Sequence, residues 1–272
     1  ELLVTIFDQS QYLTDIVCRN PEFVSWLWEE ASLERAVTRG QQLEALRRQI
    51  AAFDTFPGQA ASVRRFKRRE FLRIAVRDIF VHCPLGSLVQ DMSNLADATV
   101  IVALECASRE VQARFGRPGS GRGEQEARFA VLGMGKLAGR ELNFSSDIDL
   151  IFLYSEEGET SGGSAGTTTN ADYFRRVGER IIKMLHEQTA EGHVFRVDMR
   201  LRPYGRAGAL AVSLEAAIDY YERAGQAWER QALIKTRPIA GDAALGEQFM
   251  ERTRPFTFPR YFDDETLEDI RA

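Results

Sequence analysis

The chain has 272 residues, of which 44% are hydrophobic and 28% charged, with a net charge of −5. This is the composition of a globular protein large enough to bury a substantial core, and it argues against a general nucleic-acid binder, which would be basic. No apolar run approaches the roughly 20 residues that span a bilayer, and no signal peptide is visible, so we expect a cytoplasmic protein that does not bind membranes.

The first part of the chain, residues 1–117, is expected to be a helical region. The pair NP at 20–21 resembles an N-cap followed by proline at the first helical position, which predicts a helix over 22–37. A second helix is expected within 62–83, where apolar residues recur at helical spacing. These residues are Leu72, Val76, Ile79 and Cys83. A third helix is expected over 92–107.

A basic run, RRFKRRE, occupies residues 64–70 inside the second expected helix. We interpret this run as a solvated helix face rather than as a binding patch. The histidines show no metal-ligand spacing, so we expect none of them to take part in catalysis: His82, His186 and His193. The cysteines form no CxxC pair and are expected to be free thiols in a reducing compartment: Cys18, Cys83 and Cys106.

A glycine-rich linker over 118–126 is expected to lead into a small α/β core at 127–212. Its expected elements, in chain order, are strands over 127–134 and 147–154, a helix over 171–190 and a strand over 193–203. The loop at 155–170 is rich in Gly, Ser and Thr, and we expect it to be flexible and to act as a lid. The remaining segment, 213–272, is expected to be helical, with Ser213 as the first N-cap. The chain begins without methionine, and we expect it to be cut from a longer protein.

Two carboxylates open the second expected strand, at Asp147 and Asp149. Because side chains alternate along a strand, both point to one face, about 6.5–7 Å apart. Asp198 shares a face with Arg200 and Arg202 in the third expected strand. If the two strands lie side by side, at about 4.8 Å, the three carboxylates converge and the arginines can contact phosphoryl oxygens. Such hard ligands suit Mg²⁺ or Mn²⁺, so we expect two ions arranged for in-line phosphoryl displacement.

A glycine turn, GMGK, follows the first expected strand and precedes these acids. Exposed backbone N–H groups at such a turn bind phosphate, and we expect Gly133 and Gly135 to do so, with Lys136 adding a positive charge. The segment lacks the spacing of a Walker motif. Ser145 and Ser146 stand just before the acids, where we expect them either to bind phosphate or to hold the turn.

The order of these features is more specific than any one of them. A glycine turn, a DxD strand, a helix and a strand with a third acid follow one another in the layout of the nucleotidyltransferase fold. We therefore expect an α+β protein with a small mixed β-sheet, flanked by helical segments on both sides.

Longer segments resemble the glutamine synthetase adenylyltransferase family, from roughly Phe71 to the end of the chain. The segments are GMGKLAGRELNFSSDIDLIFLY, VFRVDMRLRPYGRAGALAVS and DYYERAGQAWERQALIKTRPIAGD. Members of this family carry two nucleotidyltransferase halves: one attaches AMP to a tyrosine of glutamine synthetase, and the other removes it by phosphorolysis. ELNFSSDIDL, the WER of QAWERQ and RPFTFPRYFDDETLEDIRA are similar to the N-terminal, adenylyl-removing half, although QAL echoes the transferase half.

The resemblance implies a role for each matching residue. Metal-binding acids are implied at Asp147, Asp149 and Asp198, and a phosphate-binding segment at Gly133, Gly135, Lys136 and Ser146. It also implies Mg²⁺ or Mn²⁺ as cofactor, phosphate, ADP and ATP as ligands, and glutamine synthetase as protein substrate, with a PII-type signal protein and glutamine as regulators of nitrogen metabolism. The chain departs from the family at Ala138, where glycine is frequent, and at Arg206, where an acidic residue is frequent.

Two alternatives to removal of AMP stay open at this point. One is the opposite reaction, in which ATP and tyrosine give adenylylated protein and pyrophosphate. The other is a regulatory module that has the same fold but no catalytic activity, with the acids retained only for folding.

Overall fold

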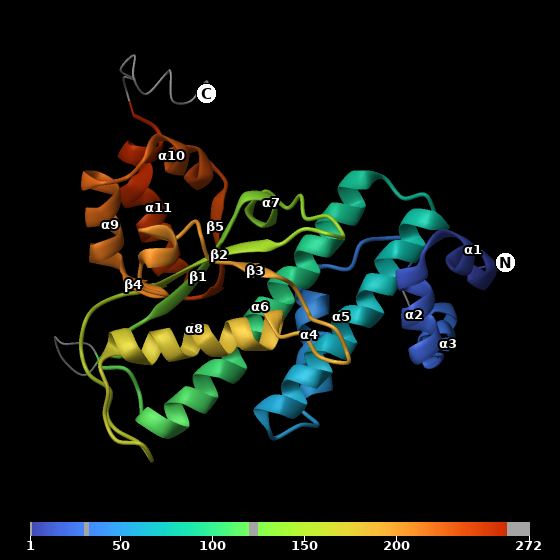
Figure 1. The fold of residues 1–272 in the computed structure, drawn as a ribbon, viewed down its shortest axis with the longest axis horizontal. Coiled ribbons are helices and arrows are strands. Elements are labelled where there is room, and N and C mark those ends of the chain that lie inside the picture. The colour runs from blue at the N-terminus through green and yellow to red at the C-terminus, as the bar shows by residue number, and fades with distance from the viewer. Residues whose placement is uncertain (1, 30–32, 120–124, 260–272) are drawn as a thin grey trace.

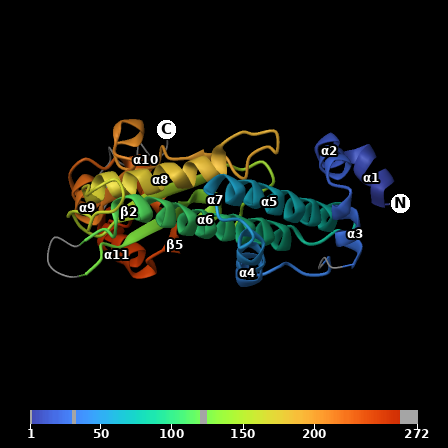
Figure 2. The same ribbon diagram turned by 90° about the horizontal axis from the view of Figure 1, so that it is seen from below.

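The computed structural model describes residues 2–29, 33–119 and 125–259, with a helical part at one end and a β-sheet at the other (Figure 1). Six helices precede the first strand: α1 (Leu2–Gln9), α2 (Gln11–Arg19), α3 (Glu22–Glu29), α4 (Arg39–Ile50), α5 (Phe56–Ile79) and α6 (Leu85–Phe115). The long helices α5 and α6 lie side by side (Figure 2). The expected helical character of this region is confirmed for the described residues.

The helix expected over 22–37 begins at Glu22 as predicted, but its expected N-cap and its expected end are wrong. Asn20 ends α2 rather than starting α3, because its side-chain amide donates to the carbonyl of Ile16 at 2.9 Å. The following helix ends at Glu29 instead of continuing to residue 37, since residues 33–37 are not helical.

The sheet is mixed and contains five strands among the described residues. They are β1 (Phe129–Met134), β2 (Ile148–Tyr154), β3 (Val197–Asp198), β4 (Ala211–Ser213) and β5 (Thr236–Gly241). Strand β1 pairs antiparallel with both β2 and β5, whereas β2 pairs in parallel with β3 and with β4. The chain is therefore an α+β protein with the nucleotidyltransferase layout expected from its motifs.

Helices cover both faces of this sheet. Helix α8 (Asn170–His186) packs against α6 in the larger hydrophobic core, which takes in one face of β1 and β2. On the other face a smaller core joins the sheet to α9 (Leu214–Arg223), α10 (Ala227–Ile234) and α11 (Ala243–Thr257). Alternate residues of β2 enter the two cores, as Phe152 and Leu153 illustrate, because side chains alternate along a strand. The start of β2 is thereby held rigidly between two packed layers.

Two expectations about the later strands were wrong. The strand expected over 193–203 is only two residues long, because the backbone turns after Asp198 into bends and the short 3₁₀ helix at Gly205–Ala207. The segment after Ser213 is not helical throughout, since β5 pairs with β1 along almost its whole length. Ser213 does cap α9, as expected, by accepting a hydrogen bond from the N–H of Ala216 at 3.4 Å.

The loop at 155–170 does not have the position expected of a lid. It leaves the far end of β2, six residues and about 20 Å beyond Asp149 at the usual rise of a strand. Its backbone is hydrogen-bonded to the end of α6: the N–H groups of Gly162 and Ala165 donate to carbonyls of Phe115 and Arg114, at 3.0 and 2.7 Å. The loop therefore belongs to the helical support rather than to the acidic site.

The basic run at 64–70 was expected to be a solvated helix face, and this prediction is wrong. Arg64, Lys67 and Arg68 are only 5%, 6% and 7% exposed, because α5 lies beneath the segment that follows α8. The three cysteines are free, as predicted. Among the described residues, every helix is too short or too polar to span a membrane.

Candidate active site

Asp149 and Asp198 face each other across two parallel strands. Strand β2 pairs with β3 so that Ile148 lies opposite Val197 and Asp149 lies opposite Asp198. Residues that are direct neighbours in adjacent strands have their side chains on the same face, about 5 Å apart. The convergence of carboxylates expected from the sequence is therefore present for Asp149 and Asp198, although β3 contains only Val197 and Asp198.

The glycine turn lies directly against this acidic pair. Gly135 begins the short helix α7 (Gly135–Ala138) with a positive φ of 54°, a conformation that strongly favours glycine. A β-carbon at this position would lie 3.5 Å from Oδ2 of Asp149. Gly135 also donates its N–H to the carbonyl of Lys235 at 2.9 Å, so the residue between α10 and β5 holds the turn in place. Backbone and carboxylate thus form one compact site.

The other two residues of the expected phosphate turn differ from each other. Gly133 lies inside β1 and is buried, where a β-carbon would be 3.1 Å from Ile239 and 3.2 Å from Leu137. Its role is to let α7 pack on the sheet, and its backbone is engaged in strand pairing, so the expected phosphate contact does not fit Gly133. Lys136 is exposed and makes no ion pair with any described residue, which leaves its ammonium group available to a ligand.

The three acids differ in their electrostatic surroundings. Burial, together with the neighbouring negative charges of Asp198 and Asp147, raises the pKa of Asp149 to about 6. A hydrogen bond from Arg200 lowers the pKa of Asp198. Burial and the repulsion of close carboxylates therefore favour protonation of Asp149, whereas the arginine favours the ionised form of Asp198.

Two arginines neutralise the acids in this structure, and the sequence drew attention to only one of them. Arg200 pairs with Asp198, with its Nε 2.7 Å from Oδ2. Arg196, not singled out from the sequence, pairs with Asp147 at 2.5 Å and donates to the carbonyl of Ser145 at 3.2 Å. Both arginine side chains are more than half exposed, at 57% for Arg196 and 63% for Arg200, so solvent screens their ion pairs. Both can turn away when a ligand arrives.

Arg202 was expected to lie at the acidic site, but its guanidinium is directed elsewhere. Its guanidinium donates to backbone carbonyls on both sides of the loop after β3, including Met199 at 2.6 Å, Ala209 at 3.1 Å and Arg206 at 3.2 Å. The prediction assumed a continuous strand through residue 203, in which positions 198 and 202 share a face. Because the strand ends at Asp198, Arg202 instead holds the loop together.

The two serines before the acids act with Asn143, a residue that sequence reasoning missed. The side-chain oxygen of Asn143 accepts hydrogen bonds from the hydroxyl of Ser146 at 2.7 Å and from the N–H of Ser145 at 3.2 Å. Of the two roles considered for these serines, the structure supports holding the turn. Asn side chains commonly bond to the backbone two residues further on, as Asn143 does with Ser145, so this residue would have been a usable clue.

Helix α6 supports both ends of the segment that carries the glycine turn. Ser93 accepts a hydrogen bond from the N–H of Leu142 at 3.2 Å. Asp97, which is fully buried, accepts one from Arg237 of β5 at 2.8 Å, and Arg237 also donates to the carbonyls of Leu137 and Ala138. The helical region is therefore part of the framework of the site.

The residues present fit a divalent cation, provided that the two arginines paired with the acids turn away. Asp149, Asp198 and Asp147 supply the hard oxygen donors that Mg²⁺ and Mn²⁺ prefer. Within the described ranges, no three His, Cys, Asp or Glu side chains are already arranged as a metal site. Mg²⁺ sites commonly use one or two carboxylates plus substrate phosphates, so the Asp149–Asp198 pair is sufficient once Arg196 and Arg200 turn outward.

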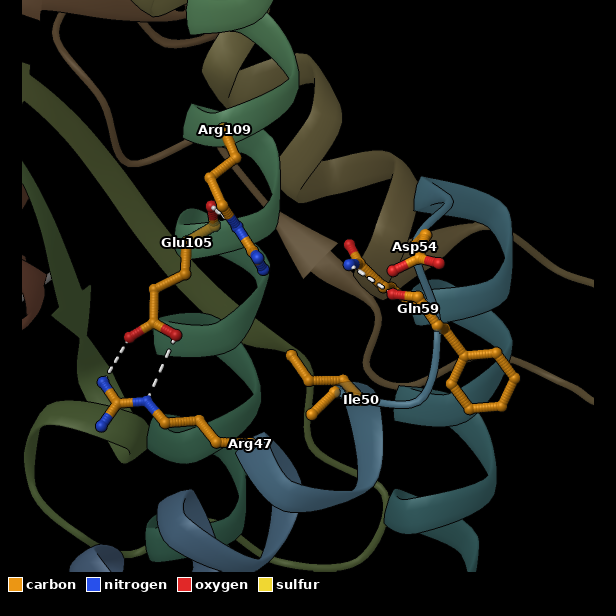
Figure 3. Close-up of a pocket in the computed structure, with 8 residues that line it drawn as sticks. Arg47, Ile50, Asp54, Gln59, Glu105 and Arg109 are labelled. Atoms are coloured by element: carbon orange, nitrogen blue, oxygen red, sulfur yellow. Dashed lines mark hydrogen bonds and ion pairs between the residues drawn. The ribbon is translucent and has the colours of Figure 1, made fainter.

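A separate pocket of about 590 Å³ lies between α4, α5 and α6 (Figure 3). Arg47 and Glu105 form an ion pair along its side, and Gln59 donates to the carbonyl of Phe53 at 2.9 Å. Its charges are balanced internally, and it is lined by none of the residues of the acidic site. We assign it no role in the chemistry.

Comparison with known proteins connects this geometry to a family. The family model described as "Glutamate-ammonia ligase adenylyltransferase" matches residues 1–252. A relative from Pseudomonas putida is 43% identical over 98% of the chain, one from Nitrosococcus oceani 40% over 99%, and one from Shewanella frigidimarina 38% over 99%. Each is named a bifunctional glutamine synthetase adenylyltransferase/adenylyl-removing enzyme, and the chain spans 28% of the length of each.

Proposed function

Because the chain belongs to the glutamate-ammonia ligase adenylyltransferase family, we propose that it removes AMP from an adenylylated tyrosine of glutamine synthetase by phosphorolysis. The observation that carries the proposal is the pairing of Asp149 with Asp198 directly beside the Gly135 turn. The names of the relatives cover both attachment and removal. The choice of removal is supported by the similarity of ELNFSSDIDL and WER to the adenylyl-removing half.

The proposed reaction exchanges one bond at phosphorus for another. An oxygen of inorganic phosphate attacks the phosphorus of the AMP–tyrosine ester in line, the bond from phosphorus to the tyrosine oxygen breaks, and ADP and tyrosine result. The leaving phenolate has a pKa near 10 and takes its proton from water, so no histidine is required. The chain contributes mainly by positioning and neutralising the reacting groups.

Each residue of the site has a definite part in this proposal. Asp149, Asp198 and Asp147 would hold two Mg²⁺ or Mn²⁺ ions, which when bound neutralise charge on the phosphoryl group. Arg200 turns from Asp198 toward a phosphoryl oxygen, which a guanidinium can bind through two donors. Lys136, exposed beside the turn, adds a point charge for the phosphate.

A product assay tests the direction of the reaction. The chain is incubated with adenylylated glutamine synthetase, phosphate and Mg²⁺, and in parallel with unmodified glutamine synthetase, ATP and Mg²⁺. Removal predicts ADP in the first reaction and no pyrophosphate in the second. Pyrophosphate alone would instead assign the transferase reaction, and an absence of both products with a folded chain would favour the non-catalytic module.

A metal titration tests the site independently of the protein substrate. Thermal unfolding of the chain is followed with ADP and increasing Mn²⁺ or Mg²⁺, and binding to the folded state should raise the midpoint. An Asp149→Asn variant should lose this rise, whereas Asp219→Asn, an exposed acid of α9, should keep it. Equal behaviour of both variants would contradict a metal site at Asp149.

The setting of the reaction belongs to the same proposal. We place it in the cytoplasm, within nitrogen metabolism, under the control of a PII-type signal protein and glutamine. We assign no residues of this chain to either regulator.

A further inference from the structure

A pocket of about 360 Å³, which we call the Lys67 pocket, adjoins the acidic site. Its walls include Tyr12, Lys67, Phe71, Phe144, Phe195 and Arg196. It shares Ser145, Ser146 and Arg196 with the surroundings of the acids, since Arg196 pairs with Asp147. A ligand in this pocket would therefore lie next to the candidate active site.

The aromatic rings of the pocket form a continuous wall. Phe71 meets Tyr12 edge to face, with ring centroids 5.3 Å apart, and meets Phe144 in the same way at 5.1 Å. Such contacts fix the ring positions and present flat apolar surface to the pocket. The wall is suited to the apolar or aromatic part of a ligand.

Lys67 brings a positive charge to this wall. Its side chain is more than nine-tenths buried, and its ammonium nitrogen lies 4.3 Å from the ring centroid of Phe71 and 5.6 Å from that of Phe195. No hydrogen bond or ion pair joins the ammonium to any residue that the structure describes. Burial lowers the pKa of Lys67 to about 8, and the charge of Arg68 acts in the same direction.

The four arginines of the same basic run provide an internal comparison. Each has a carboxylate partner: Arg64 with Glu187, Arg65 with Glu22, Arg68 with Glu191, and Arg69 with Glu70. Among these neighbouring cations Lys67 alone has no anion in the described part of the chain. A cation–π contact offsets only a part of the free-energy cost of burying an ammonium group. A negatively charged ligand near Lys67 would therefore be stabilising.

We propose that the Lys67 pocket binds an organic anion, whose carboxylate or phosphate group pairs with Lys67 while its apolar part lies against Phe71, Phe144 and Phe195. The anion belongs either to a free small molecule or to a side chain of the protein substrate. The proposal does not rest on the direction of the adenylyl reaction, because it concerns a site next to the acids and not the acids themselves.

Three related probes separate the two parts of this recognition. Phenyl phosphate carries both the ring and the anion, phenol lacks the anion, and inorganic phosphate lacks the ring. Each is titrated into the chain by calorimetry in EDTA, so that metal-dependent binding at the acids is absent. We expect saturable binding of phenyl phosphate that is about tenfold or more tighter than that of the other two probes. No saturable binding of phenyl phosphate to the wild-type chain would overturn the proposal.

Substitutions at Lys67 assign the binding to this pocket. Lys67→Met keeps the length and apolar stem but removes the charge, and should weaken phenyl phosphate binding about tenfold or more. Lys67→Arg should retain most of the affinity, and Lys183→Met, at an exposed lysine of α8, should leave it unchanged. Equal affinity of Lys67→Met and the wild type would overturn the proposal.

A measurement on the wild-type chain covers the case in which Lys67→Met does not fold. Acetylation of Lys67 and Lys183 is followed by mass spectrometry with and without saturating phenyl phosphate. Occupancy of the pocket should slow acetylation of Lys67 but not of Lys183, and an unchanged rate at Lys67 would overturn the proposal.

The source of the anion is then distinguished in the deadenylylation assay. If the anion is part of the protein substrate, Lys67→Met should raise the KM for adenylylated glutamine synthetase with little change in kcat. If it is a free molecule, the KM should be unchanged without added anion, and phenyl phosphate should alter the rate of the wild type but not of Lys67→Met. Failure of the whole assay in the wild type would contradict the proposed function while leaving the binding results in force.

Discussion

Arg237 of β5 donates a hydrogen bond to the fully buried Asp97 of α6, at 2.8 Å. The same guanidinium holds the carbonyls of Leu137 and Ala138, at 3.0 and 3.1 Å, at the end of the short helix that Gly135 begins. The ion pair therefore connects the helical region, the sheet and the glycine turn through one side chain. Its position explains how α6 supports the site.

Asp97→Asn should destabilise the chain and disturb the turn. The substitution leaves Arg237, which is only 16% exposed, without a charged partner at 2.8 Å, and breaking a buried pair in this way costs about 3–5 kcal/mol. Urea unfolding followed by circular dichroism measures the loss, with Asp219→Asn on the surface of α9 as the control. Wild-type stability of Asp97→Asn would show that the pair does not support the structure.

Asp149→Asn should lower turnover strongly without unfolding the chain. The neutral amide is a weaker ligand of Mg²⁺ than a carboxylate, and loss of a group that stabilises the reacting charge typically costs about 10²–10³ in kcat. Stability without metal should be equal to or greater than that of the wild type, because one of three neighbouring carboxylates no longer repels the others. ADP formation and thermal unfolding are measured on the same sample. Full activity in this variant would exclude the acid from the reaction.

The pKa of Asp149, raised to about 6, predicts a pH dependence of the metal-free chain. In the unfolded chain this group titrates near its ordinary value of about 3.9, so between these pH values the folded state binds more protons than the unfolded state. The contribution of this residue to the free energy of unfolding should therefore fall as the pH rises from about 4 to about 6. The difference between wild type and Asp149→Asn isolates it from other titrating groups. A pH-independent difference would contradict the raised pKa.

Binding of a divalent cation should have the opposite pH dependence. A metal ion requires the ionised form of Asp149, so affinity for Mn²⁺ should decrease as the pH falls below about 6. Calorimetric titration of Mn²⁺ with ADP at several pH values measures this change.

Gly135→Ala should impair the reaction more than its effect on stability would suggest. Gly135 has a φ of 54°, where an L-residue costs about 1–2 kcal/mol, and the added methyl would lie 3.5 Å from the carboxylate oxygen of Asp149. Gly166→Ala is a matched control, since Gly166 has a φ of 83° with nothing within 4 Å of a β-carbon and lies in the loop at 155–170. Both variants should lose similar stability, and only Gly135→Ala should lose turnover. Equal activities would mean that the turn does not approach the reacting groups.

Local patterns were sufficient to predict the central part of the fold. The strands at 129–134 and 148–154 lie within two residues of their expected starts, because continuous apolar runs next to a glycine turn leave few alternatives. The amphipathic helix α8 and the N-cap at Ser213 were recognised for similar local reasons. The convergence of Asp149 with Asp198 also followed, since the period of two along a strand determines which side chains share a face.

Other features depend on contacts between segments far apart in the chain. Strand β5 was missed because TRPIAG contains a proline and follows a helix, and only its pairing with β1 makes it a strand. The burial of the basic run could not be read from its charges, because its acidic partners at Glu187 and Glu191 come more than 120 residues later. Likewise, nothing in its local sequence linked Arg196 to Asp147.

The sequence by itself indicated where a candidate site lies, from a glycine turn, two aspartates at strand spacing and a third aspartate in a later segment. Tertiary structure alone decided how these groups are held. It determined which arginines neutralise the acids and that Arg202 bonds to a loop instead of facing them. It also placed Asp97 where it stabilises the turn through Arg237. The physical reason is the separation along the chain of the residues that interact. Strand periodicity and backbone conformation are set by neighbouring residues, whereas ion pairing and burial depend on which distant segments the folded chain brings together.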